Sequence, residues 1–243
     1  MGRFAIALIL AGVAAAQSRT PVVVELFTSE GCSSCPPADD LLWRLESASP
    51  SLSIEVIALS EHVDYWNQLG WQDRFSSPLF SARQQEYGRA FRQDNVYTPQ
   101  IVINGQTEVL GSDSRRVLQE IRRAADGSRA NIEMTLLSPE SLRLKVESVP
   151  ADTQDADILL AITETQLATS VQAGENTGRL LRHTGVVRSL VSLGRLDRKK
   201  AGAYSADVAL RFRPEWRRPN LKLVLLVQDR SSRRIVGAAS LHL

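Results

Sequence analysis

Two cysteines separated by two residues, directly after the pattern of a buried strand, constrain the fold of this chain more than any other feature. The segment Val22 to Phe27 is an almost continuous apolar run rich in β-branched residues, which is typical of a strand covered on both faces. Cys32-Ser33-Ser34-Cys35 follows after a short loop. Two residues between cysteines at the start of a helix can bring both sulfurs to bonding distance. The pattern predicts a strand, a dithiol or disulfide site and a helix, in that order.

The rest of the first half shows alternating helix and strand periodicities. The first helix connects two apolar strand runs, so the sequence predicts a β-α-β unit with parallel strands and a right-handed crossover. Asn104-Gly105 is a strong hairpin signal. The elements expected after the cysteines are a helix over Pro37–Leu45, a strand over Leu52–Leu59, a helix over Ser77–Phe91, a hairpin of Gln100–Ile103 with Gln106–Leu110, and a helix over Ser114–Ala125.

After residue 129 the pattern changes to the alternation of strands. Residues 132–136, 142–146 and 221–227 show it, with no long helical pattern between them, which predicts a small all-β, sandwich-like domain. Acidic side chains outnumber basic ones over residues 17–128, and the reverse holds over 129–243. We therefore expect an α/β domain over 17–128 and the β domain over 129–243.

The first sixteen residues have the three parts of a secretory signal peptide. Arg3 gives a positive start, Phe4 to Val13 is apolar, and Ala14-Ala15-Ala16 offers a small-residue cleavage site. The apolar run is shorter than the roughly 20 residues that span a bilayer. We expect an exported protein, periplasmic or secreted, with residues 1–16 removed and no membrane anchor after cleavage. In such a compartment a cysteine pair is either a structural staple or a redox site.

The order of elements, with Thr98-Pro99 at the start of the hairpin, resembles the thioredoxin fold over about residues 21–126. This resemblance implies an α/β thioredoxin-like domain in which Pro99 is cis and lies against the active site, while Thr98 presents its backbone to substrate. A helix N-terminus stabilises a thiolate, so Cys32 is expected to be the exposed nucleophile and Cys35 the resolving thiol.

Four acidic or proline residues near the motif modify this expectation. Pro36-Pro37 disfavours the α region for the residue before each proline, which predicts a helix start later than in thioredoxin. Glu30 would raise the pKa of Cys32 if the two groups lie close. Glu25 is either a buried acid that assists proton transfer to Cys35, as an aspartate does in thioredoxin, or a strand-edge carboxylate that faces water.

An aromatic segment lies between the second strand and the following helix. His62, Asp64, Tyr65, Trp66 and Trp71 either line a substrate groove beside the thiols or form a loop whose tryptophans pack on the core. Two cysteines and one histidine fall short of a four-ligand zinc site, so no metal and no cofactor is expected.

A basic group lies in the second half of the chain. His183 is accompanied by Arg179, Arg182 and Arg188, and these residues either dock an acidic partner or the acidic first half, or form a solvated strand face.

Longer stretches resemble the DUF1223 family of exported thioredoxin-like proteins. This resemblance implies an architecture and no particular reaction. The matching residues are Glu25–Asp39, His62–Trp66, Leu69–Trp71, Ala82–Gln84, Tyr97–Gln100, Gly178-Arg179, His183 and Val186–Arg188.

The expected function is therefore that of an exported thiol–disulfide oxidoreductase, whose substrate is a protein or small-molecule thiol or disulfide. The alternative is a non-enzymatic binding protein in which Cys32 and Cys35 form a structural disulfide. The formal net charge is +2, and there is no phosphate-cradling glycine loop or nucleotide fingerprint, so nucleic acid is not an expected partner.

Overall fold

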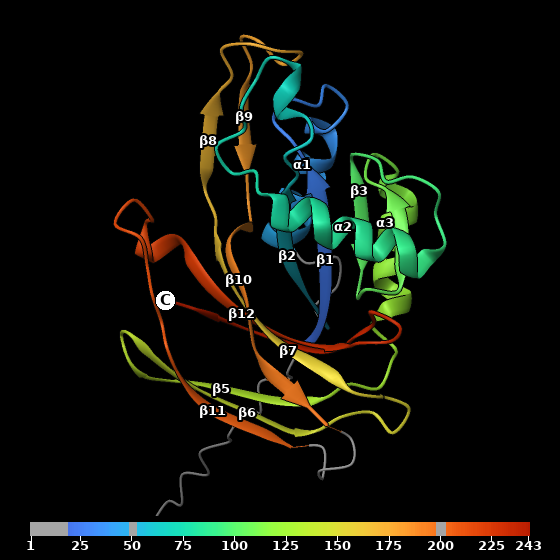
Figure 1. The fold of residues 1–243 in the computed structure, drawn as a ribbon, viewed down its shortest axis with the longest axis vertical. Coiled ribbons are helices and arrows are strands. Elements are labelled where there is room, and N and C mark those ends of the chain that lie inside the picture. The colour runs from blue at the N-terminus through green and yellow to red at the C-terminus, as the bar shows by residue number, and fades with distance from the viewer. Residues whose placement is uncertain (1–18, 49–52, 198–202) are drawn as a thin grey trace, which may run out of the picture.

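The structure is a computed structural model that describes residues 19–48, 53–197 and 203–243 (Figure 1). The expected signal peptide over residues 1–16 lies outside the described residues. Most of the described chain is built around one large mixed sheet, with helices at one end and a smaller sheet at the other (Figure 1).

The large sheet has eight strands in the order β13-β12-β7-β10-β2-β1-β3-β4. β1 and β2 are parallel in register from Thr20 opposite Ile54 to Thr28 opposite His62, as the β-α-β prediction requires. The strands are β1 (Thr20–Thr28), β2 (Ile54–His62), β3 (Gln100–Ile103), β4 (Thr107–Leu110), β7 (Ala156–Glu164), β10 (Val186–Leu196), β12 (Leu221–Asp229) and β13 (Ile235–His242).

The predicted fold class, a thioredoxin-like α/β domain followed by a separate all-β domain, is wrong. Strands from both halves of the chain form one sheet, because β10 pairs with the outer edge of β2 through Val186 opposite Ser60. The Ser60 amide donates to the Gly185 carbonyl at 2.8 Å. Without β10 this side of β2 would be an open edge at Ser60, and the pairing across the halves satisfies the Ser60 amide.

Three helices flank the first-half strands within the described residues: α1 (Pro36–Ser47), α2 (Pro78–Phe91) and α3 (Ser114–Ala124). Each predicted helix is present within two residues of its expected bounds. β1 is covered on both faces, as its apolar run predicts: Val24 packs with α1 and α3, whereas Phe27 packs with Tyr87 of α2. The Asp113 side chain caps α3 by accepting from the Arg116 amide.

The second half supplies two smaller sheets. β5 (Asn131–Ser138), β6 (Ser141–Ser148) and β11 (Tyr204–Ala209) form one of them, and Leu144 packs with Leu160 and Leu225 of the large sheet in a shared core. β8 (Leu167–Ser170) and β9 (Leu180–His183) form a hairpin that stands beside α1 (Figure 1). This hairpin brings the second half of the chain to the cysteines.

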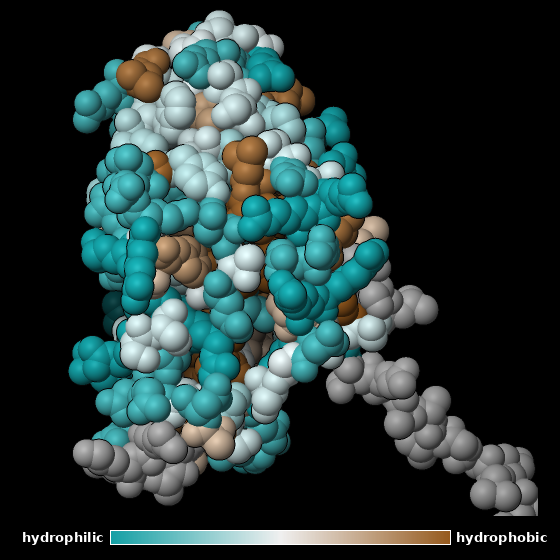
Figure 2. Space-filling model, turned by 90° about the vertical axis from the view of Figure 1, so that its right-hand side faces the viewer, coloured by the Kyte–Doolittle hydropathy of each residue, from teal (hydrophilic) through white to brown (hydrophobic). Residues whose placement is uncertain are grey.

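Two short 3-10 helices, η1 (Asn67–Leu69) and η3 (Arg218–Asn220), lie in connections. The side of the molecule shown in Figure 2 is mostly hydrophilic, with hydrophobic side chains scattered over it rather than joined in one patch. Among the described helices, none is long and apolar enough to cross a membrane.

Candidate functional site around the cysteine pair

Cys32 and Cys35 form a disulfide at the start of α1, with Cα atoms 5.4 Å apart. The helix begins immediately afterwards, at Pro36, and Cys35 is its N-cap residue in the right-handed helical region (φ −77°, ψ −37°). The helix thus begins one residue before the expected Pro37, and Cys35 adopts the α region that a following proline usually disfavours. Pro36 and Pro37 occupy the first helical positions, where a proline loses no intrahelical hydrogen bond and its φ already suits the helix.

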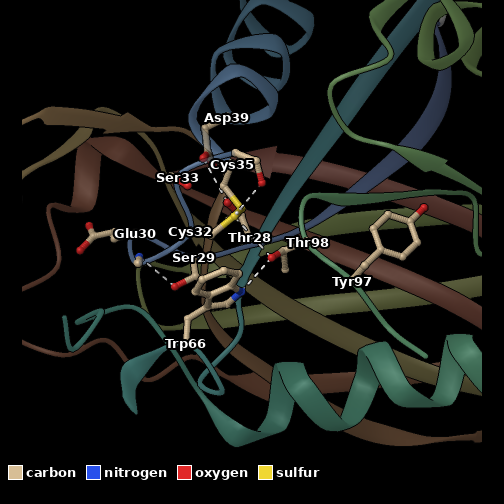
Figure 3. The surroundings of a disulfide bond; sticks show 12 residues. Thr28, Ser29, Glu30, Cys32, Ser33, Cys35, Asp39, Trp66, Tyr97 and Thr98 are labelled. Carbon is tan, nitrogen blue, oxygen red and sulfur yellow. Dashed lines mark hydrogen bonds between the residues drawn. A yellow bond between two sulfur atoms is a disulfide. The ribbon is translucent and has the colours of Figure 1, made fainter. Parts of the chain in front are cut away.

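The sulfur of Cys32 has two hydroxyl neighbours. The Thr98 hydroxyl donates to Cys32 Sγ at 3.4 Å, and Ser34 Oγ lies 3.4 Å from the same atom (Figure 3). Trp66 Nε1 donates to Thr98 Oγ1 at 2.8 Å, which fixes the threonine beside the sulfur. The Thr98–Pro99 peptide bond is cis, as the resemblance implies. Hydroxyl donors of this kind favour the charged form of a thiol over the neutral form.

Both cysteines are fully buried, at 0% exposure, so the expected exposure of Cys32 is not found in the disulfide form. The loop between β8 and β9 covers part of the cysteine segment. Asn176 Nδ2 donates to the carbonyl oxygens of Glu30 and Cys32, both at 2.9 Å, and Glu175 accepts from the Ser33 amide at 3.1 Å. The disulfide is thus held between its own loop and a segment more than 140 residues later.

Glu30 is buried and its carboxylate points away from the disulfide (Figure 3). Trp71 Nε1 donates to Glu30 Oε2 at 2.8 Å, and His183 Nε2 lies 3.2 Å from Oε1. Burial would raise the pKa of Glu30, but the hydrogen bonds from His183 and Trp71 outweigh it and hold the pKa below the usual 4.5. The expected repulsion between Glu30 and a Cys32 thiolate is therefore offset by a charged histidine.

His183 is buried between two carboxylates. Its Nδ1 lies 3.9 Å from Asp39 of α1, opposite the contact with Glu30. Burial alone would lower the pKa of His183, but Asp39 and Glu30 raise it to about 9. Asp39 also accepts from Thr28 at the end of β1, at 3.1 Å. A cationic imidazole thus joins the C-terminal end of β1, the first turn of α1 and the end of β9.

A second buried histidine adjoins this cluster. His62 Nδ1 lies 2.6 Å from Asp73 Oδ2, and the Glu30 amide donates to the same oxygen at 2.9 Å. Burial would raise the pKa of Asp73, but the charge and hydrogen bond of His62 lower it overall. The His62 and His183 rings meet edge to face at 4.9 Å between centroids, and Phe75 contacts both.

The five residues predicted to line a groove are divided among three environments. Trp66 lies at the disulfide, whereas His62 and Trp71 belong to the charged cluster behind it. Asp64 and Tyr65 instead face α2: Asp64 accepts from Ser81 at 2.5 Å, and Tyr65 donates to Gln84 at 3.0 Å. Their role in binding a substrate stays a prediction.

Glu25 is fully buried, so its interpretation as a carboxylate facing water is wrong. Arg83 of α2 donates to it through Nε at 3.1 Å and also donates to Gln228 of β12 at 3.0 Å. Glu61 lies 3.4 Å from the same guanidinium, and burial raises the pKa of Glu61 to about 8. These contacts place Glu25 in a charge cluster between α2 and the sheet, and its proton-transfer role for Cys35 stays a prediction.

The basic group predicted around His183 does not form one surface. His183 contacts acidic residues of the first half, Arg179 donates to Asn176 at 2.7 Å, and Arg188 pairs with Glu164 at 3.4 Å. Arg179 and Arg182 line one cleft of about 270 Å³ beside the start of α1, and Arg188 is not part of it.

Sequence reasoning did not identify Asp39, Asp73 or Asn176 as parts of the site. Asp39 carried a usable signal, because it follows Cys35 by four residues and so lies one helical turn from it. Asp73 and Asn176 carried none, since their positions depend on how distant loops fold. Across the described ranges, no three His, Cys, Asp or Glu side chains are grouped to hold a metal ion.

The fold and the family can be compared with known proteins. A family model described as "Protein of unknown function (DUF1223)" matches residues 23–228. No curated protein matches the chain. A crystal structure of a protein from Agrobacterium tumefaciens is similar over 93% of this chain and 95% of that one, with 27% identity and a TM-score of 0.73. HBP35 of Porphyromonas gingivalis is similar over 93% of this chain and 76% of its own, at 14% identity and a TM-score of 0.64, which is a likeness of fold.

Proposed function

Because the chain belongs to the DUF1223 family, whose description assigns no reaction, we propose its function from the cysteine pair: an exported thiol–disulfide oxidoreductase that acts through Cys32 and Cys35. The observation that carries this proposal is the asymmetry around the two sulfurs. Cys32 Sγ has the Thr98 and Ser34 hydroxyls at 3.4 Å, while Cys35 occupies the N-cap position of α1 without a side-chain capping bond. These contacts favour Cys32 as the thiolate of the reduced form.

The exchange begins from the reduced protein. The Cys32 thiolate attacks one sulfur of a substrate disulfide, which forms a mixed disulfide and releases the other substrate sulfur as a thiolate. Cys35, after losing its proton to water or a buffer base, attacks Cys32 Sγ and releases the second substrate thiolate. Two electrons pass from the protein to the substrate, and the Cys32–Cys35 disulfide results. The same steps run in reverse when the substrate is a dithiol of lower reduction potential.

The cover over the disulfide determines which substrates can react. With both cysteines at 0% exposure, a substrate sulfur reaches Cys32 only after Trp66 or the Asn176 loop moves aside. The loop is held to the cysteine segment by a few hydrogen bonds, each worth about 1 kcal/mol net. Such a cover slows non-specific thiols and admits a partner that displaces it.

An exported location supports the same proposal. A disulfide persists in the periplasm or outside the cell, whereas the cytosol keeps most thiols reduced. The sequence pattern of residues 1–16 is that of a signal peptide.

A second candidate function rests on the complete burial of the cysteines. A disulfide without exposed sulfur suits a structural staple in a non-enzymatic binding protein. In that case the reduced protein would lose stability and Cys32 would show no selective reactivity.

Trapping of a mixed disulfide distinguishes the two candidates. A Cys35→Ser variant, incubated with an excess of a small aromatic disulfide, should retain one adduct on Cys32 because the resolving thiol is missing. The Cys32→Ser variant is the matched control, since it also retains one thiol and should react at least about tenfold more slowly. The rate of adduct formation is measured by mass spectrometry. Equal rates for the two variants would contradict the difference in reactivity between Cys32 and Cys35 on which the proposal depends.

A further inference from the structure

We propose that a cleft of about 550 Å³ between the η1–α2 loop and the β11–β12 connection is a binding site for an organic or inorganic oxyanion, a carboxylate or a phosphate. Four arginines and two glutamates line it, namely Arg74, Arg188, Arg213, Arg217, Glu164 and Glu215. The cleft therefore has a surplus of two positive charges. This site is separate from the proposed thiol chemistry and does not depend on it.

Three of the guanidinium groups are held in place by aromatic rings. Arg74 and Arg188 both stack against Phe75, with 4.6 Å and 5.2 Å between the guanidinium carbon and the ring centroid. Arg188 also lies 5.6 Å from the Trp216 ring, which Arg213 approaches at 6.0 Å. Cations and rings thus alternate in one row, and this stacking orients guanidinium groups before any ligand binds.

The carboxylates of the cleft neutralise only part of this row. The Glu164 carboxylate already has two partners: it accepts a hydrogen bond from the Arg217 amide at 2.9 Å and forms an ion pair with Arg188 at 3.4 Å. Glu215 lies 3.9 Å from Arg213, and both of these side chains are more than half exposed, so this pair is weak. Arg74 donates to the Ala168 carbonyl at 3.1 Å and, within the described residues, pairs with no carboxylate.

The electrostatic environment of Arg188 also favours the binding of an anion. Burial lowers the pKa of Arg188 and the neighbouring Arg74 and Arg213 cations lower it further, although Glu164 acts against them. A bound oxyanion would relieve this repulsion among cations. Guanidinium groups bind carboxylate and phosphate through paired N–H donors, which is the chemistry that the row offers.

Direct binding of two simple anions tests the site. Isothermal titration of the full chain with inorganic phosphate and with succinate, up to about 10 mM and at constant ionic strength, should give saturable binding of at least one of them. The anion that binds more tightly identifies the class of ligand. Chloride at the same ionic strength should not compete. Absence of saturable binding for both anions would overturn the proposal.

Variants locate the binding. Arg213→Ala and Arg74→Ala remove exposed side chains and should each weaken binding at least about fivefold, whereas Glu215→Gln should strengthen it because a competing carboxylate is lost. Arg123→Ala on α3 removes the same charge from a side chain of similar exposure outside the cleft and should leave affinity unchanged. If Arg213→Ala, Arg74→Ala and Arg123→Ala bind alike, the anion binds elsewhere and the assignment is wrong.

Discussion

The two halves of the chain contribute different things to the region around the disulfide. The first half supplies the chemical groups: both cysteines, the Thr98 hydroxyl and the Trp66 indole. The second half supplies their surroundings, with His183 bonded to Glu30 across 153 residues and Asn176 bonded to Cys32 across 144. The comparison indicates that the side chains around the sulfurs come from the first half, whereas charge compensation of Glu30 and part of the burial of Cys32 depend on the second half.

Removal of Arg83 should have the largest effect, because this residue ties Glu25 and Glu61 of the first half to Gln228 of the second. Arg83→Met leaves Glu25 and Glu61 buried without their cation, and we expect a loss of about 3–5 kcal/mol in the free energy of unfolding. Urea denaturation measures it. Arg89→Met on the exposed side of α2 is the control, and a similar loss in both variants would contradict the account.

The His183→Gln substitution should destabilise by about 3 kcal/mol at low and neutral pH. The pKa of His183 in the folded protein, about 9, lies above its usual 6.5, so its contribution is complete below pH 6.5 and is lost as pH rises through 9. The difference in unfolding free energy between wild type and variant should therefore shrink across this interval. For the control His242→Gln, at an exposed histidine, the difference in unfolding free energy from wild type should not shrink between pH 6.5 and 9. A constant difference from pH 6 to about pH 9.5 would mean that His183 is not a buried cation.

Gly185→Ala tests the joint between the halves. Gly185 has φ of +58°, and a Cβ there would lie 2.5 Å from the Ala58 carbonyl oxygen of β2. We expect a loss of about 2 kcal/mol, from the left-handed backbone and from displacement of β10. Gly178→Ala is matched in φ, at +79°, but has open space around it and should cost about 1 kcal/mol. Equal losses by thermal denaturation would show that the β2–β10 contact tolerates displacement.

Asn176→Ala should have the smallest effect on stability and a selective one on the disulfide. The variant loses both hydrogen bonds to the cysteine segment, worth about 1–2 kcal/mol, so dithiothreitol should reduce Cys32–Cys35 several times faster. Gln172→Ala changes an exposed amide in the same loop and should leave the rate unchanged. An unaltered rate for Asn176→Ala would show that this loop does not control access.

Local patterns in the sequence were sufficient to predict the first-half elements. The apolar run of β1, the proline start of α2 and Asn104-Gly105 each report on nearby residues, and β3 and β4 pair as expected. The joining of the halves was not predictable in this way. It depends on the pairing of β10 with β2, which the structure shows at one pair, Val186 with Ser60, and no local period marks it.

The candidate site shows the same division. Cys32, Cys35 and Thr98-Pro99 are recognisable because their spacing and order are local features. The burial of Glu30 and the raised pKa of His183 are not, because a charged residue in a sequence predicts a solvated surface unless its partner is known. The α conformation of Cys35 was not predicted, because the rule for residues before proline makes no allowance for prolines at the first helical positions.

A redox titration of Cys32–Cys35 against glutathione tests the central claim most directly. Thiol–disulfide exchange as a function predicts a reduction potential between about −270 and −120 mV, with the reduced protein still folded. A potential below about −300 mV, together with loss of fold on reduction, would contradict it and identify the bond as a structural staple.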